Sequence, residues 1–244
     1  MLRSSITLVT KTSTTLRFPP LQKLLALFVS KKMKQEYADH RALSTEKVER
    51  RLATETTRPD FMSYILASNP AKGGMTRDEI HRNAATFISA GSETTATILA
   101  GATWYLLKNP DCLKRFTQEI RSAFASVEDI KLDKIEKLTY LHAVIDESFR
   151  IYPPALAGQP RLSPPQGDTV SGYFIPGGTG IQLNQHAAFR STLNFTSPGA
   201  FAPSRWLGDK RFAGDRLDVV QPFSVGPRNC IGKKYGFMPF IIAK

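Results

Sequence analysis

The chain has 244 residues, a formal net charge of +12, and hydrophobic and charged fractions of 41% and 22%. These fractions are ordinary for a soluble globular protein, and the length suffices for one domain with a sizeable core. The two cysteines, Cys112 and Cys230, lie far apart, which excludes a disulfide framework, and scattered histidines without a C-x-x-C pair argue against zinc. The positive charge favours an acidic partner or an anionic membrane surface over nucleic acid, because the sequence carries no DNA- or RNA-binding motif.

The first 35 residues contain seven basic side chains and no acidic one, and Ser and Thr are frequent before residue 18. This composition is typical of a mitochondrial transit peptide, but we favour a segment that does not pack. We predict a poorly structured segment over residues 1–18 and a domain over residues 19–244. The most apolar stretch near this end, residues 21–29, is far shorter than the ~20 residues that a membrane-spanning helix needs.

Residues 21–54 are predicted to form one or two solvated helices, and Asp60 is placed to cap a short helix that ends near Leu66. A much longer helix follows. The spacing T-x-x-E at Thr76–Glu79 is that of a capping box, and the next helix stop is Asn109-Pro110. The predicted helix therefore has about 33 residues and is roughly 50 Å long.

The centre of this long helix, residues 87–102, is apolar or small on nearly every face, which predicts burial on all sides. It contains Ala-Gly-Ser-Glu-Thr-Thr over residues 90–95. Gly91 is unfavourable inside a helix, and adjacent hydroxyls compete for backbone carbonyls and can widen the helix locally. The carboxyl of Glu93 beside a hydroxyl indicates either a proton relay or a packing glycine with satisfied polar neighbours.

Further elements follow in order. An amphipathic helix is predicted from Pro110 to about residue 125, and another over residues 138–150. Residues 172–183 indicate a strand, a turn and a second strand, and residues 209–218 a polar meander.

The helix at 138–150 carries Glu147 and Arg150 at a spacing that lets them pair. Such a pair on a surface contributes less than about 1 kcal/mol, so the motif alone indicates little. A second arginine, Arg205, follows in the apolar stretch Phe-Ala-Pro-Ser-Arg-Trp at residues 201–206. A buried glutamate between two arginines is costly to desolvate and locks one geometry.

Residues 223–232 have the spacing F-x-x-G-x-R-x-C-x-G. Glycines at 226 and 232 and a proline at 227 predict a tight loop that presents Cys230. Backbone N–H groups around the sulfur could tune a bound metal, and Arg228 could pair with an anionic group beside it. A buried structural cysteine is the alternative for a lone thiol.

These four motifs, in this order between residues 76 and 232, resemble those of the cytochrome P-450 monooxygenases. The amino-acid sequences of these motifs are similar to those of fungal microsomal members of the trichothecene-hydroxylase type. The resemblance implies a mainly α fold with a small β region, namely the C-terminal half of the cytochrome P-450 fold. In that half a long distal helix, an E-x-x-R helix, a meander and a cysteine loop surround haem.

The resemblance also assigns roles to single residues. It implies that Cys230 is the thiolate ligand of haem iron and that Arg228 and Arg161 hold its propionates. Phe223, Gly226 and Gly232 would complete the cofactor-binding loop.

On the long helix, the resemblance implies that Gly91 opens a groove for dioxygen and that Glu93 and Thr94 deliver protons. Glu147, Arg150 and Arg205 would form a structural triad behind the loop. The substrate would be lined by Phe87, Ile88, Ala90, Ala155 and Leu156.

The function implied is insertion of one oxygen atom from O2 into an apolar small molecule, possible classes being terpenoids or other secondary metabolites. The cofactor would be haem b, and electrons would come from an NADPH-dependent flavoprotein reductase, to which Arg228, Lys233 and Lys234 could present a basic face. The family implies a location at the endoplasmic reticulum membrane. If the basic residues at the start of this sequence are the true N-terminus, a cytoplasmic or mitochondrial location is implied instead.

The sequence departs from the family in length, since full-length members are about twice its size. We therefore expect an incomplete fold at both ends and exposed apolar surface on the long helix. After Cys230, Gly236 and Pro239 disfavour the helix that the family carries there. Two alternatives stay open: a truncated fragment without catalysis, and a helical interaction protein without haem.

Overall fold

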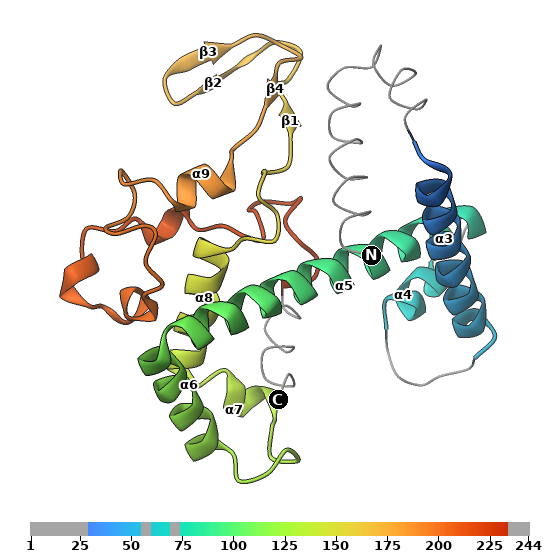
Figure 1. The fold of residues 1–244 in the computed structure, drawn as a ribbon. Helices are drawn as coiled ribbons and strands as arrows, with labels where there is room; N and C mark the ends of the chain where they lie inside the picture. Colours follow the sequence, from blue (N-terminus) through green and yellow to red (C-terminus); the bar gives the residue numbers. More distant parts are fainter. Residues whose placement is uncertain (1–28, 55–59, 69–73, 234–244) are drawn as a thin grey trace. The chain divides into compact units, whose positions relative to one another are not determined.

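A computed structural model describes residues 29–54, 60–68 and 74–233. The chain divides into two units, residues 1–93 and 94–244, and the long helix α5 (Arg77–Lys108) contributes to both. The described part is mainly helical with a small β region (Figure 1), which confirms the predicted class. The predicted poorly structured segment, residues 1–18, lies outside the described residues.

The first unit contains α3 (Lys31–Leu52), α4 (Phe61–Ala67) and the beginning of α5. Asp60 caps α4, as predicted, by accepting hydrogen bonds from the backbone N–H and the hydroxyl of Ser63, both at 2.8 Å. Arg51 at the end of α3 pairs with the same carboxylate, Nε to Oδ2, at 2.6 Å. One aspartate therefore both starts α4 and ties it to α3.

The long helix begins and ends where its sequence signals predict. The Thr76 N–H donates to the Glu79 carboxylate at 2.7 Å, and the Glu79 N–H donates to the Thr76 hydroxyl at 3.3 Å. This is the predicted capping box. The helix ends at Lys108, immediately before Asn109-Pro110, and it is continuous through Gly91.

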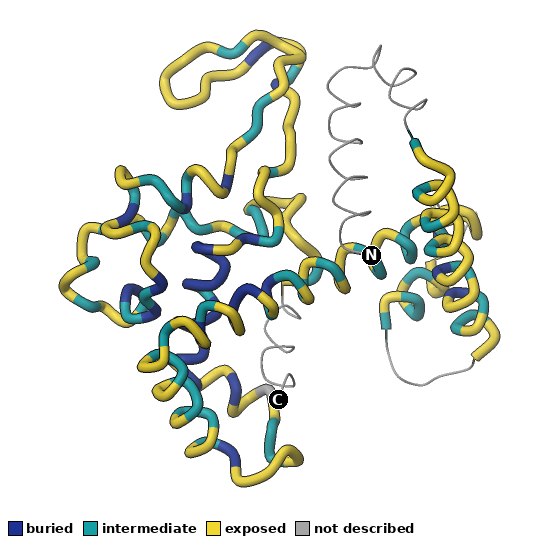
Figure 2. Tube along the Cα trace, viewed as in Figure 1, coloured by how far each residue is buried: buried dark blue, intermediate teal, exposed yellow. Residues whose placement is uncertain are grey.

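The prediction that residues 87–102 are buried on all sides is wrong for the first part of that stretch. Phe87 is 37% exposed and residues 90–92 are exposed, whereas Ile98 and Ala102 are only 3% exposed (Figure 2). The reason is the position of the packing partners, because the buried cluster of the second unit includes α5 from Ile98 onward. The other expectation, exposed apolar surface on this helix, is confirmed, since Phe87, Trp104 and Leu107 are exposed.

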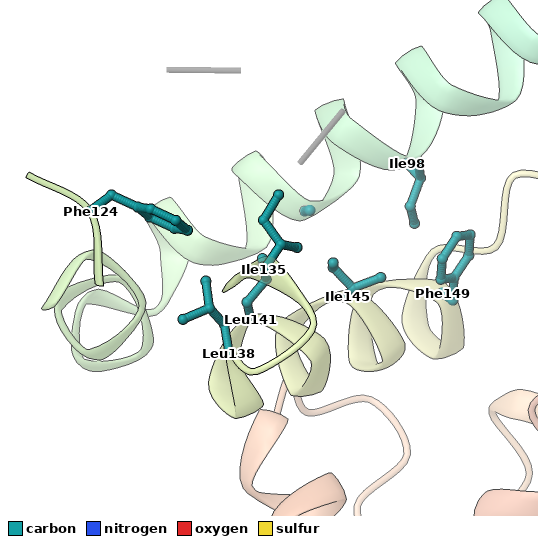
Figure 3. Close-up of a cluster of buried hydrophobic side chains, with 8 residues drawn as sticks. Ile98, Phe124, Ile135, Leu138, Leu141, Ile145 and Phe149 are labelled. Carbon is teal, nitrogen blue, oxygen red and sulfur yellow. The ribbon is translucent and has the colours of Figure 1, made fainter. Parts of the chain in front are cut away.

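The second unit is built around α8 (Thr139–Ile151), whose residues are almost all buried. It packs against α6 (Pro110–Ala123), α7 (Leu132–Ile135) and the end of α5. Helix α7 lies between the helices predicted at 110–125 and 138–150, where no element was predicted, and Ile135 is its buried contribution. Figure 3 shows the principal cluster, which comprises Ile98, Ala102, Phe124, Ile135, Leu138, Leu141, Ile145 and Phe149.

The β region is a nested pair of two-stranded antiparallel sheets. The outer pair joins β1 (Arg161–Leu162) to β4 (Gly180–Ile181), and the inner pair joins β2 (Asp168–Val170) to β3 (Tyr173–Ile175). The inner turn is Ser171-Gly172, where both residues have positive φ, as a two-residue hairpin requires.

After β4 the chain forms α9 (Gln185–Phe189) and then three short 3-10 turns, η2 (Pro203–Leu207), η3 (Lys210–Phe212) and η4 (Leu217–Val219). The last two occupy the predicted polar meander. Among the helices within the described ranges, none combines the length and apolar character that a membrane span requires.

Candidate functional site

The cysteine loop, residues 223–232, is a closed turn that carries a free thiol. The Cys230 N–H donates to the Phe223 carbonyl at 2.9 Å, and the Asn229 N–H donates to the Gly226 carbonyl at 3.1 Å. Ser224 and Gly226 have φ of 60° and 79°, which lets the chain reverse within this short span. Cys230 is exposed and unpaired with Cys112, as the sequence predicted.

One end of this loop is anchored on α8. The ring of Phe223 meets the ring of Phe149 edge-on, with centroids 5.0 Å apart, and packs against the principal cluster. Phe149 belongs to the helix that carries Glu147 and Arg150. The position of the loop therefore depends on α8.

The sulfur has little steric cover on its own loop. A Cβ built on Gly232 would lie 3.7 Å from the Cys230 sulfur, so the glycine leaves open space beside the thiol. Arg228, two residues earlier, is exposed, and so is Lys233. The loop thus presents one thiol and one guanidinium on an accessible surface.

This arrangement fits haem better than it fits a metal ion bound by protein alone. Within the described ranges, no group of three or more histidine, cysteine or acidic side chains could hold a metal ion. Haem iron is already held by its ring nitrogens, so a single axial thiolate from the protein suffices. An exposed cysteine with an arginine for an anionic substituent has the required donor set.

The helix that anchors the loop, α8, also carries part of a buried charge cluster. Glu147, Arg150 and Arg205 have fully buried side chains. The Arg150 guanidinium donates to Glu147 through Nε at 2.8 Å and through Nη2 at 2.7 Å, and Arg205 Nε lies 3.4 Å from Glu147 Oε2. The three residues that the sequence analysis grouped are thus in contact.

The cluster joins α8 to η2 and to the loops before it. Glu147 also accepts hydrogen bonds from the Ala202 N–H at 2.9 Å and the Trp206 indole N–H at 3.0 Å. Arg150 donates to the carbonyls of Phe189, Pro198 and Ala200 at 2.8 to 3.0 Å. Segments that are about 50 residues apart in sequence are therefore fixed to one helix.

The predicted relay residues lie together on α5. Gly91, Glu93 and Thr94 occupy one turn of continuous helix, with Glu93 half-buried and the other two exposed. The Ser92 hydroxyl donates to the Ile88 carbonyl, and this bond leaves the helix unbroken. Phe87 and Ile88 lie on the preceding turn, and the latter is half-buried.

The remaining predicted site residues lie after α8. Ala155 and Leu156 are exposed, and their segment is held by the Leu156 carbonyl, which accepts from the His186 N–H at 3.1 Å. Arg161 lies on β1, is exposed, and donates to the Pro160 carbonyl at 3.0 Å. The sequence analysis did not foresee β1 or its pairing.

Two acidic residues that support this region were missed. Glu119 on α6 accepts hydrogen bonds from the Tyr140 and Leu141 N–H groups, at 2.8 and 2.7 Å, and so caps α8 from a neighbouring helix. Asp215 in the meander pairs with Arg205, and its side chain is 1% exposed. Neither residue belongs to a local motif, and the sequence offers no signal for such long-range partners.

Comparison with known proteins agrees with this architecture. The cytochrome P450 family profile matches residues 2–239. Cytochrome P450 monooxygenase atr2 of Stereocaulon alpinum is 44% identical over 219 residues, which is 90% of this chain and 43% of that protein. Cytochrome P450 monooxygenase astA of Talaromyces wortmannii is 41% identical over 221 residues, which is 91% of this chain and 45% of that protein.

A third relative, cytochrome P450 monooxygenase astD of Aspergillus oryzae, is 44% identical over 230 residues, covering 93% of this chain and 45% of the relative. The chain thus spans less than half the length of these curated fungal relatives. The family profile nevertheless covers nearly all of the chain. The chain therefore belongs to the cytochrome P450 family.

Proposed function

We propose that this chain is the haem-binding C-terminal half of a fungal monooxygenase that oxidises an apolar small molecule of secondary metabolism. The domain would extend over residues 19–244, with residues 1–18 outside it. The observation that carries this proposal is the cysteine loop, whose exposed thiol, closed turn and neighbouring arginine rest on a helix fixed by buried charges. The relatives' shared name, cytochrome P450 monooxygenase, supports the same reaction class.

In this proposal the cysteine loop holds haem b. Cys230 would bind the iron through its thiolate, and Arg228 and Arg161 would pair with the propionates. Gly226 and Gly232 would give the chain room beside the ring, and Phe223 would hold the loop on α8. When bound, haem with a thiolate ligand supplies the cleavage of the dioxygen O–O bond.

Residues of α5 would handle protons and dioxygen. Glu93 and Thr94 would bind and pass protons, since a half-buried carboxyl beside a hydroxyl can exchange them through one water. Gly91 would leave room for dioxygen. Phe87, Ile88, Ala90, Ala155 and Leu156 would contact an apolar substrate.

Electrons would come from an NADPH-dependent flavoprotein reductase. Arg228 and Lys233 are exposed at the cysteine loop, and a basic surface suits an acidic partner. Lys234, grouped with them in the sequence analysis, lies outside the described residues. We place the protein at the endoplasmic reticulum membrane, as the family implies.

The test is the carbon monoxide difference spectrum of the dithionite-reduced chain, expressed with haem supplied. A red-shifted Soret band typical of thiolate-ligated iron is expected. Cys230→Ala should abolish the band, whereas Cys112→Ala, which removes the other free thiol, should leave it. No haem, or a band typical of histidine-ligated iron, would instead favour a fragment or interaction protein without catalysis.

A further inference from the structure

The buried charge cluster is not neutral when only its three predicted members are counted. Arg150 and Arg205 each bring a positive charge, and Glu147 brings one negative charge, with all three side chains 0% exposed. Each buried charge needs a compensating partner, because the free-energy cost of leaving it unpaired is several kcal/mol. The cluster therefore calls for a second buried carboxylate.

Asp215 supplies that carboxylate from the meander. Its Oδ2 pairs with Nη1 of Arg205, and its Oδ1 accepts the Thr196 N–H at 2.7 Å. The same Nη1 donates to the Thr196 carbonyl at 3.1 Å. Asp215 and Arg205 thus both bind the backbone of Thr196. With Asp215 included, the two arginines and the two carboxylates sum to zero charge.

Aromatic rings complete the enclosure of the two arginines. The ring of Phe195 lies 5.3 Å from the Arg150 guanidinium carbon and 5.6 Å from that of Arg205. Phe212, in the meander itself, lies 4.2 Å from the Arg205 guanidinium carbon. These faces attract the cations but carry no net charge, so they do not replace a carboxylate.

Asp215 also lies on the path to the cysteine loop. The next residue, Arg216, donates its N–H to the Asn194 carbonyl at 2.8 Å, which fixes the backbone at this point. From there η4 leads to the Gln221 carbonyl, which accepts from the Gln185 amide at 3.1 Å, and then to Phe223. The segment before the loop therefore has an anchor at each end.

We propose that Asp215 is a positioning residue that neutralises Arg205 and thereby fixes the meander from which the cysteine loop extends. The charge balance concerns the folded chain itself. Only the consequence for Cys230 as an iron ligand rests on the proposed function.

The test is a double-mutant cycle in urea unfolding of the full chain, with Asp215→Asn, Arg205→Met and the pair. Asparagine keeps the shape and an acceptor for Thr196 but removes the charge. We expect Asp215→Asn to lower the folding equilibrium constant about a hundredfold in the presence of Arg205 and less than about threefold in the Arg205→Met background. Equal losses in both backgrounds would overturn the proposal.

The matched control is Asp218→Asn in the same meander. Its partner is Arg216 at 3.2 Å, and the two side chains are 61% and 70% exposed, so the change should cost less than about threefold. An Asp215→Asn chain that loses no more than this control contradicts the proposal. If Asp215→Asn does not fold, a folded double variant supports the proposal, and failure of both to fold overturns it.

A second readout tests the effect on the cysteine loop. With haem supplied, Asp215→Asn should reduce the share of the red-shifted carbon monoxide complex, and Asp218→Asn should not. If the unaltered chain takes up no haem, the proposed function fails while the unfolding cycle still decides the role of Asp215. If haem binds and the share is unchanged, Asp215 does not position the loop.

Discussion

Gly226 illustrates how a single residue controls the cysteine loop. Its φ of 79° lies in the left-handed region, and no atom lies within 4 Å of the position that a Cβ would take. The requirement for glycine is therefore conformational rather than steric. A side chain at this position would strain the turn that closes between Phe223 and Cys230.

We accordingly expect Gly226→Ala to lower the free energy of unfolding by about 1 kcal/mol and to weaken haem retention. Gly214→Ala is the control, because that glycine also has open space around it but no positive φ. Urea unfolding and haem release to apomyoglobin measure the two effects. Equal behaviour of the two variants would contradict a conformational role for Gly226.

Asp146, beside Glu147 on α8, gives the fold a pH dependence. Burial raises the pKa of its carboxyl from 3.8 to about 6, and the opposing influence of His142 is smaller. Between these values the folded chain holds a proton that the unfolded chain has lost. The contribution of the protonated Asp146 carboxyl to stability is therefore fully present below about pH 4 and is lost as the pH rises through 6.

Asp146→Asn should remove this loss and raise the free energy of unfolding at pH 7 by about 3 kcal/mol, since the pKa is raised from 3.8 to about 6 and one pKa unit corresponds to ~1.4 kcal/mol. Urea unfolding between pH 4 and about pH 8 measures the slope. Asp133→Asn, at an exposed position of α7, serves as the control. A slope that survives in Asp146→Asn would show that another group causes it.

At the scale of elements, α8 depends on α6 for its first turn. The residue before it, Leu138, offers no side-chain cap, and Glu119 accepts the hydrogen bonds instead. The negative carboxylate also suits the positive end of the helix dipole. The helix that carries Glu147 and Arg150 is thus stabilised by a residue about twenty positions earlier in the chain.

Glu119→Ala should therefore lower the free energy of unfolding by about 1–2 kcal/mol, the range found for lost caps. Glu136→Ala, at an exposed position before α8, should change it by less than about 0.5 kcal/mol. Chemical denaturation monitored by circular dichroism measures both. Equal effects of the two substitutions would show that the cap is not stabilising.

Helix α5 shows which elements could be predicted from the sequence. Its start at Thr76–Glu79 and its end before Pro110 follow from local signals, as does the cap of α4 at Asp60. The strands predicted over residues 172–183 are β3 and β4, whereas their partners β1 and β2 were not predicted, because strands of two or three residues have no alternation to detect. Their existence depends on pairing across the hairpin.

Some residues of the candidate site could likewise be predicted from the sequence, and others could not. Spacing paired Glu147 with Arg150, and the family resemblance added Arg205 to them. Glu119 and Asp215 could not be found, because charged residues at unmarked positions are usually solvated, and only tertiary packing half-buries Glu119 and buries the side chain of Asp215. The burial of residues 87–96 was overestimated because periodicity reports the apolar character of a face, not the presence of a partner.

At the scale of the whole molecule, the two units differ in how much they bury. In the described part of residues 1–93, only Ser44, Val48 and Ile80 are buried, whereas the second unit holds the principal cluster and the buried charges. Local opening is easiest where few buried contacts must be broken. We therefore expect two levels of stability within one chain.

Hydrogen exchange followed by mass spectrometry should resolve these levels. Amides of α3 and α4 should exchange early, and those of α8 should exchange last, because α8 is buried along nearly its whole length. Peptides of α6 provide an internal reference of intermediate burial. Protection of α3 equal to that of α8 would contradict this order.

The distance in sequence between Glu147 and Asp215 has a consequence for synthesis. The aspartate leaves the ribosome about 70 residues after the glutamate, which at ~5–20 residues per second is a delay of roughly 4–14 seconds. During that interval Glu147 lacks Arg205, whose own partner Asp215 is also missing, and the α8 residues Tyr140, Val144 and Ile151 are not covered by Phe201. The nascent chain should therefore engage chaperones at this stage, and slower translation at low temperature should raise the yield of folded protein.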